Sequence, residues 1–144
     1  MKTHVVRVES GPGGFAPLFV ATREAGLRIG WLELDAVVAP PVSLGTAAAH
    51  GALRAVALAE GSSLSLKPRR GGAVMKDLVR EHFSGCALVL AQSSAWGLRG
   101  EEPPLLQAAA DGETWEVVVA QNPPLRMTTA ELVAALRRPR PWTS

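Results

Sequence analysis

Two loops contain residue types that bind anions. The first, Ser10-Gly11-Pro12-Gly13-Gly14, lies between a predicted strand and a predicted helix. Glycines let backbone N–H groups approach a phosphate, and the N-terminus of the following helix favours negative charge. The loop matches neither the dinucleotide-binding glycine motif nor the phosphate-binding loop that ends in Gly-Lys-Ser/Thr. We therefore predict Gly11, Gly13 and Gly14 as anion-binding candidates, with an ordinary tight turn as the alternative.

The second loop, Lys67-Pro68-Arg69-Arg70-Gly71-Gly72, precedes the clearest helical pattern of the chain. Cations beside the free N–H groups of a helix would bind a phosphate or carboxylate. Because cations oppose the helix dipole at this end, either Asp77 or a bound anion must compensate them. Lys67, Arg69 and Arg70 are anion-binding candidates, and a solvated loop without a ligand is the alternative. The two loops would form one site only if their strands are parallel neighbours.

The C-terminal tail combines arginines with an aromatic side chain. Arg137, Arg138 and Arg140 alternate with prolines, and Trp142 follows them. Arginine and tryptophan bind single-stranded nucleic acid through charge and stacking, and they also anchor protein interfaces. We predict these four residues as partner-binding candidates on an extended tail. The alternatives are a tail that docks on its own domain and a frayed terminus.

The residues that could catalyse a reaction are few. His4, His50 and His82 lie on three separate predicted elements, and the single Cys86 lies in an apolar run. No pair of histidines has the spacing of a metal site, so the sequence predicts no metal and no cofactor. A nucleophile elbow is also absent. The catalytic residues are therefore unknown, and the sequence leaves enzyme activity open.

Hydrophobic periodicity predicts the elements that position these residues. Strands are predicted over 3–9, 28–38, 63–67, 86–91, 105–109 and 113–120, and helices over 15–25, 46–60, 73–83 and from 128 to before Pro139. Asp111-Gly112 predicts a hairpin, and Thr128 with Glu131 predicts a capping box. Segment 46–60 has a competing interpretation, in which 54–58 is a strand that pairs with 63–67.

These elements predict an α+β fold in one domain, with helices packed on a mixed β-sheet as a two-layer or three-layer sandwich. The domain spans 1–136, and 137–144 form an Arg/Pro-rich tail. The chain has 144 residues, of which 47% are hydrophobic and 19% charged. That length and composition suffice for one core and exclude a disordered chain or a disulfide scaffold.

Charge and hydropathy predict a protein of the cytoplasm. The net charge of +2, from 15 basic and 13 acidic residues, makes no strong nucleic-acid footprint. Charged residues interrupt the first ten positions, so no signal peptide is expected. The longest uncharged stretch, 36–53, contains prolines and glycines that make it a poor membrane span. We therefore expect no membrane partner.

The segment from Gly45 to Phe83 resembles the helix–strand–basic-loop–helix unit of enolpyruvyl transferases. The similarity rests on Gly45-Thr46 and Lys67-Pro68-Arg69 and covers about a quarter of the chain. The segment lacks that family's catalytic surroundings, so it implies no activity.

Two functions follow from these observations. The first is a non-catalytic binding or accessory protein that acts through a protein partner, self-association or a nucleic acid. It is favoured by the basic tail and by the scarcity of reactive groups. The alternative is a small enzyme or sensor that handles a phosphorylated or other anionic metabolite, and it is favoured by the two anion-binding loops.

Overall fold

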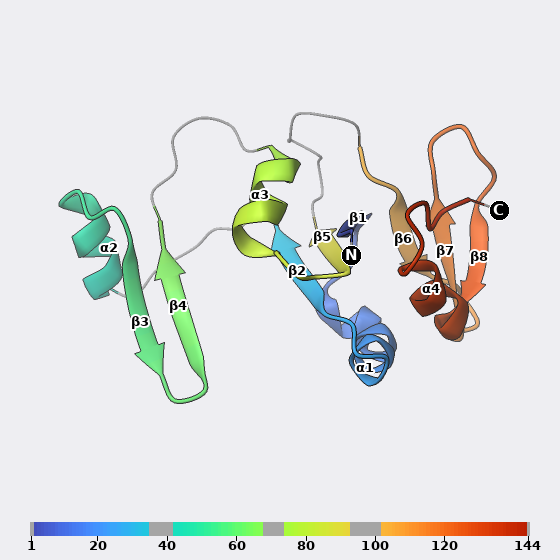
Figure 1. Cartoon of the computed structure of the whole chain (residues 1–144), viewed down its shortest axis with the longest axis horizontal. Coiled ribbons are helices and arrows are strands. Elements are labelled where there is room, and N and C mark those ends of the chain that lie inside the picture. The colour runs from blue at the N-terminus through green and yellow to red at the C-terminus, as the bar shows by residue number, and fades with distance from the viewer. Residues whose placement is uncertain (1, 35–41, 68–73, 93–101, 144) are drawn as a thin grey trace. The chain divides into compact units, whose positions relative to one another are not determined.

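The computed structural model describes residues 2–34, 42–67, 74–92 and 102–143 (Figure 1). These residues belong to two compact units, which are 1–35 with 73–144, and 36–72. The first unit contains a six-stranded sheet and the second a two-stranded sheet.

The six-stranded sheet is mixed, as predicted. Its strands are β1 (His4–Val8), β2 (Ile29–Glu33), β5 (Leu88–Gln92), β6 (Leu105–Ala108), β7 (Thr114–Val118) and β8 (Leu125–Thr128). The spatial order is β2-β5-β1-β6-β7-β8. The pairs β2–β5, β5–β1 and β1–β6 are parallel, whereas β6–β7 and β7–β8 are antiparallel. In β5 the residues Leu88–Ala91 are all buried, because this strand is covered on both faces.

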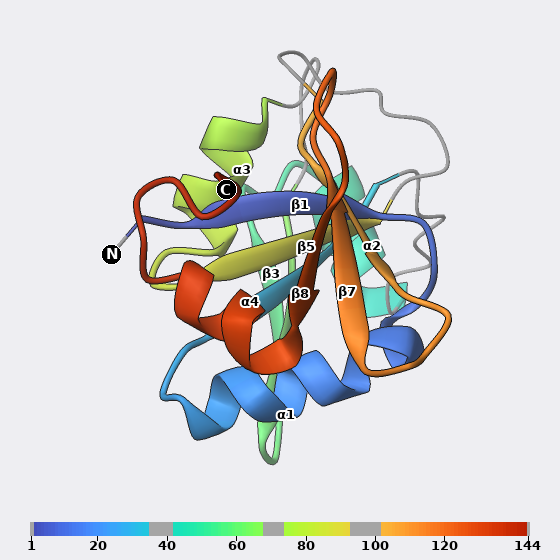
Figure 2. The same cartoon turned by 90° about the vertical axis from the view of Figure 1, so that its right-hand side faces the viewer.

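Helices pack on this sheet. The first unit holds a short 3-10 helix η1 (Pro12–Phe15), α1 (Ala16–Glu24), α3 (Met75–His82) and α4 (Thr129–Ala135). Helices α1 and α4 lie side by side against one face of the sheet (Figure 2). The capping box at α4 is confirmed, since Thr128 Oγ1 accepts from the Glu131 N–H at 3.1 Å and the Glu131 carboxylate accepts from the Thr128 N–H at 3.4 Å.

Three aromatic rings join the N-terminal part of this unit to its antiparallel part. Phe15 stacks on Trp115 with ring centroids 5.7 Å apart, and it meets Trp31 at 6.2 Å in a tilted arrangement. The Trp115 indole N–H donates to Thr129 Oγ1 at 2.9 Å. Phe15 therefore packs between β2 and β7 at the start of α1.

On β2, a glycine lets an aromatic ring lie directly on the backbone. A Cβ atom at Gly30 would lie 2.5 Å from Phe83 Cδ1 and 2.8 Å from Phe83 Cε1. Phe83 is the residue that follows α3, so the segment after this helix reaches the sheet at Gly30. Only glycine accommodates that approach without a shift of the ring.

The predicted hairpin around Asp111-Gly112 is confirmed. Ala108 pairs with Trp115, and Gly112 adopts a positive φ of 73°. The Asp111 carboxylate accepts the N–H groups of Glu113 and Thr114, and these hydrogen bonds hold the pKa of Asp111 below its usual value.

The second unit corrects the prediction for 46–60. It contains α2 (Val42–Ala49) and an antiparallel hairpin of β3 (Ala55–Ala59) and β4 (Ser62–Leu66). The predicted helix is wrong after Ala49, and the competing strand interpretation is the observed one. Gly51 adopts a φ of 97° just after the helix, which residues with a side chain rarely adopt. The order of elements therefore differs from the helix–strand–basic-loop–helix unit that this segment resembles.

The hairpin also leaves apolar side chains in solvent. Leu64 is 50% exposed, and Leu58 is 82% exposed. Leu44 and Ala55 are the buried hydrophobic residues among 42–67. The described part of this unit thus has a very small core.

Two further predictions differ from the structure or cannot be compared with it in full. Strand β2 covers 29–33 of the predicted strand 28–38, and residues 35–38 lie outside the described residues. Strand β8 was not predicted, because it has four residues and follows directly after Pro123-Pro124. It forms the antiparallel edge of the sheet.

Candidate functional site

The glycine loop lies at the carboxyl end of β1, where ligands commonly bind in open α/β sheets. Gly11 is extended, with φ −71° and ψ 172°, and Gly13 belongs to η1. A Cβ at Gly11 or Gly13 would meet nothing within 4 Å, and one at Gly14 would meet only Ser10 Oγ at 3.5 Å. Neither packing nor a positive φ requires glycine at these three positions. The backbone of the loop is therefore open to an approaching molecule.

Two carboxylates lie near this end of β1, and their negative charge would repel a bound anion. Arg7 is 3.7 Å from the Glu9 carboxylate and 3.8 Å from that of Glu102. Its Nε also donates to the Pro103 carbonyl at 3.2 Å. The cation closest in sequence to the glycine loop is therefore already shared by two acids.

The second predicted loop is only partly described. Lys67 follows β4 in the second unit, and Arg69 and Arg70 lie outside the described residues. Strand β4 pairs with β3 and belongs to a different sheet from β1. The parallel pairing that a joint anion site needs is thus not found among the described strands. The roles of Lys67, Arg69 and Arg70 stay predictions.

The C-terminal tail folds back on its own unit in a series of turns, so the expectation of an extended tail is wrong. Arg137 Nη2 donates to the Ala25 carbonyl at the end of α1 at 2.8 Å, and Arg138 Nη2 donates to the Pro141 carbonyl at 3.0 Å. Trp142 packs against the hydrophobic core. Two of the four predicted partner-binding residues, Arg137 and Arg138, therefore hold the tail in place.

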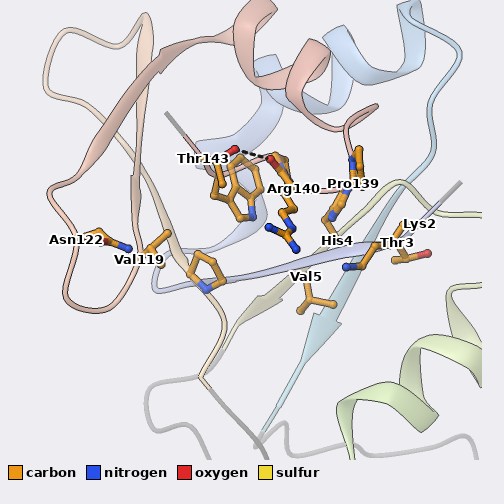
Figure 3. A pocket seen from close by; sticks show the side chains of 12 residues that line it. Lys2, Thr3, His4, Val5, Val119, Asn122, Pro139, Arg140 and Thr143 are labelled. Atoms are coloured by element: carbon orange, nitrogen blue, oxygen red, sulfur yellow. Dashed lines mark hydrogen bonds between the residues drawn. The ribbon is translucent and has the colours of Figure 1, made fainter.

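The other two, Arg140 and Trp142, line a cavity of about 430 Å³ between the amino end of β1 and the tail (Figure 3). Arg140 reaches from the tail toward β1, with Val119 and Asn122 on one side and His4 on the other. The cavity is lined by Lys2, Thr3, His4, Val5, Pro104, Val119, Asn122, Pro139, Arg140, Pro141, Trp142 and Thr143.

The lining of this cavity is basic. No Asp or Glu is among the described residues that line it. Within the described parts of the chain, the charged groups of Lys2 and Arg140 make no hydrogen bond or ion pair. Two exposed cations therefore line the same cavity.

His4 adds a buried titratable group to this cavity. Its side chain lies on the same face of β1 as Val6 and Val8 and is only 6% exposed. Its Nε2 is buried and has no hydrogen-bond partner among the described residues. Burial lowers the pKa of His4 from its ordinary value of 6.5, and the charge of Lys2 adds to that effect. The carbonyls of Arg138 and Leu136 act in the opposite direction.

The buried imidazole should make stability depend on pH. Since the folded state keeps His4 neutral below pH 6.5, the unfolded chain takes up the proton first as the pH falls. The free energy of unfolding is therefore expected to decrease from about pH 6.5 downward, until the pH falls below the folded-state pKa. Urea unfolding at several pH values should show a shallower decrease in His4→Gln than in the wild type. His50→Gln, which replaces an exposed histidine, is the control, and equal slopes in wild type and His4→Gln would contradict this role.

A second cavity, of about 390 Å³, adjoins the first. It is lined by Val119, Asn122, Pro123, Pro124, Leu125, Trp142 and Thr143. Four of these residues, namely Val119, Asn122, Trp142 and Thr143, also line the first cavity. None of the described residues that line the second cavity is charged. The two cavities thus share four lining residues but differ in charge.

Two of the partner-binding candidates, Arg140 and Trp142, line this cavity, and their role in binding stays a prediction. Lys2 and His4, which also line it, are not among the residues predicted from the sequence. The alternation His4-Val5-Val6-Arg7-Val8 places His4 on the buried face of the strand, and that signal was available. The pairing of the two ends of the chain was not visible in any local pattern.

The described residues contain no group of three His, Cys, Asp or Glu side chains that could hold a metal ion. Among the same residues, no helix is long and apolar enough to cross a membrane.

The fold and the cavity define an α/β domain whose mixed sheet carries a basic cavity at the amino end of a central strand. No protein-family model matches the chain, and no curated protein matches it either. Among solved structures, the crystal structure of Bacillus subtilis MobB is similar, with 16% sequence identity and a TM-score of 0.45. The match covers 71% of this chain and 65% of that chain, which is less than two thirds of its length. At this identity and TM-score, the similarity carries no argument about function.

Proposed function

We propose that the protein is a cytoplasmic binding domain that acts without catalysis and holds an anionic group in the cavity between β1 and the tail. The observation that carries the proposal is the presence of Lys2 and Arg140 at one cavity, with no Asp or Glu among the described residues that line it. The anion would belong to a partner, since proteins, nucleic acids and metabolites all present carboxylates or phosphates.

The physical basis is the attraction between an anion and two exposed cations. The Arg140 guanidinium can donate two parallel hydrogen bonds to a carboxylate or phosphate, and Lys2 adds a second positive charge. Pro139, Pro141 and Trp142 add apolar surface beside these groups.

A second candidate function is a small enzyme or sensor for an anionic metabolite. The cavity volume of about 430 Å³ favours it, because small-molecule sites are typically about 300–1,000 Å³. Such a protein would use the same basic groups, so both candidates place the ligand at Arg140.

Neutralising Arg140 tests the proposal. Inorganic phosphate should bind the wild type, and Arg140→Gln should weaken that binding at least about 10-fold, because the variant loses the positive charge and its charged hydrogen bonds to the anion. Lys2→Gln should weaken it by several-fold. The measurement is an NMR titration at constant ionic strength.

Lys76→Gln is the matched control, because it removes the same charge from exposed α3, away from the cavity lining. Its affinity for phosphate should equal that of the wild type. An Arg140→Gln protein that binds phosphate as well as the wild type would overturn the proposal.

A further inference from the structure

We propose that the two adjoining cavities are two halves of one site for a small amphipathic organic anion. The carboxylate or phosphate of the ligand lies at Arg140 and Lys2, and its apolar arm lies in the second cavity against Trp142. The inference rests on the proposed function and adds the chemical class of the ligand.

Continuity between the cavities is the first argument. Val119, Asn122, Trp142 and Thr143 line both of them, so a molecule in the first cavity meets the wall of the second. Figure 3 shows Val119, Asn122 and Thr143 on the side of Arg140 that faces away from His4. The two cavities therefore lie next to each other at these shared residues, with the basic side of the first cavity beyond Arg140.

The difference in charge is the second argument. The first half has Lys2, His4 and Arg140 in its lining, whereas the second has Pro123, Pro124 and Leu125 in addition to the shared residues. An anion is attracted to the first half, and an apolar group gains by leaving water in the second. A ligand with both features is therefore complementary to the whole site.

The residues that line both cavities suit the part of the ligand that joins its anionic group to its apolar arm. The Trp142 indole offers a flat apolar surface for an aliphatic chain or ring. The Asn122 amide offers a neutral donor and acceptor. Thr143 Oγ1 donates to the Arg140 carbonyl at 3.0 Å, and this hydrogen bond connects the Arg140 backbone to the shared wall.

A series of carboxylates tests the inference on the wild-type protein. Acetate and 3-phenylpropionate carry the same charge, and 3-phenylpropanol carries the same arm without the charge. We expect 3-phenylpropionate to bind at least 10-fold more tightly than either acetate or 3-phenylpropanol. Binding is followed in NMR spectra through the indole N–H signal of Trp142.

A variant in the second cavity separates the two halves. Pro124 is exposed, so Pro124→Asp should fold normally while it places a carboxylate beside the apolar arm. It should reduce the affinity for 3-phenylpropionate by a larger factor than that for acetate, because only 3-phenylpropionate places an apolar arm in the second cavity. Ala110→Asp adds the same charge in the β6–β7 turn and should change neither affinity.

The outcomes distinguish the two proposals. If acetate and 3-phenylpropionate bind equally well and both depend on Arg140, the amphipathic ligand is excluded and the anion site remains. If Pro124→Asp binds 3-phenylpropionate as tightly as the wild type, the second cavity does not hold the arm. If no anion binds the wild type, the proposed function and this inference both fail.

Discussion

Replacing Phe15 with alanine is expected to destabilise the first unit by about 3–5 kcal/mol, the usual cost of removing a buried aromatic ring. Phe15 is 2% exposed and contacts both Trp31 and Trp115. Its loss would open a cavity between two strands that come from distant parts of the chain. Urea unfolding followed by tryptophan fluorescence measures the effect, because both neighbouring indoles report on this packing.

Val20→Ala is the matched control for that prediction. Val20 lies in α1, the helix that begins directly after Phe15, and its side chain is 47% exposed. Truncation of this side chain should therefore change the free energy of unfolding by no more than about 0.5 kcal/mol. A loss below about 1 kcal/mol for Phe15→Ala would show that the ring does not hold β2 and β7 together.

Adding one methyl group at Gly30 should also be costly. In Gly30→Ala the new Cβ would lie within 2.8 Å of two Phe83 ring atoms, so the ring or the strand must move. Overpacking of this kind typically costs about 1–3 kcal/mol. Thermal and urea unfolding of the variant would measure the loss.

Two variants make that test specific. Gly13→Ala introduces a methyl group where nothing lies within 4 Å, and it should leave the protein as stable as the wild type or slightly more so. In a Phe83→Ala background, Gly30→Ala should cost less than about 0.5 kcal/mol, because the two changes are coupled through one contact. If Gly30→Ala lowered the free energy of unfolding as much in the Phe83→Ala background as in the wild type, the contact with Phe83 would not be the source of the strain.

Patterns within a few residues predicted most of the first unit correctly. The apolar run before Gln92 forms a central strand because both faces are covered, and Asp111-Gly112 forms a hairpin because Gly112 accepts a positive φ. Thr128 and Glu131 begin α4 through a reciprocal pair of hydrogen bonds. Each of these signals depends on local stereochemistry, which the sequence contains directly.

The candidate site depends on contacts between distant residues, so it could be predicted only in part. Arg140 and Trp142 have chemical types that suggested binding, but their turn-rich placement depends on Arg137 reaching the Ala25 carbonyl, 112 residues away in the chain. For 46–60, alanine content favoured a helix, while the hairpin partner 62–66 provides the hydrogen bonds that a strand needs. Tertiary pairing overrides intrinsic propensity in such segments.

The sheet order has a consequence for the synthesis of the protein on the ribosome. Both neighbours of β1, namely β5 and β6, are translated in the later part of the chain, and His4 pairs with Leu88. At about 5–20 residues per second, roughly 4–17 s pass between the translation of these two residues. During that time Val6 and Val8 lack the strands that later cover them. Of the strands of this sheet, β1 is therefore the one that waits longest for its neighbours, and it is the strand to which a chaperone has the longest opportunity to bind.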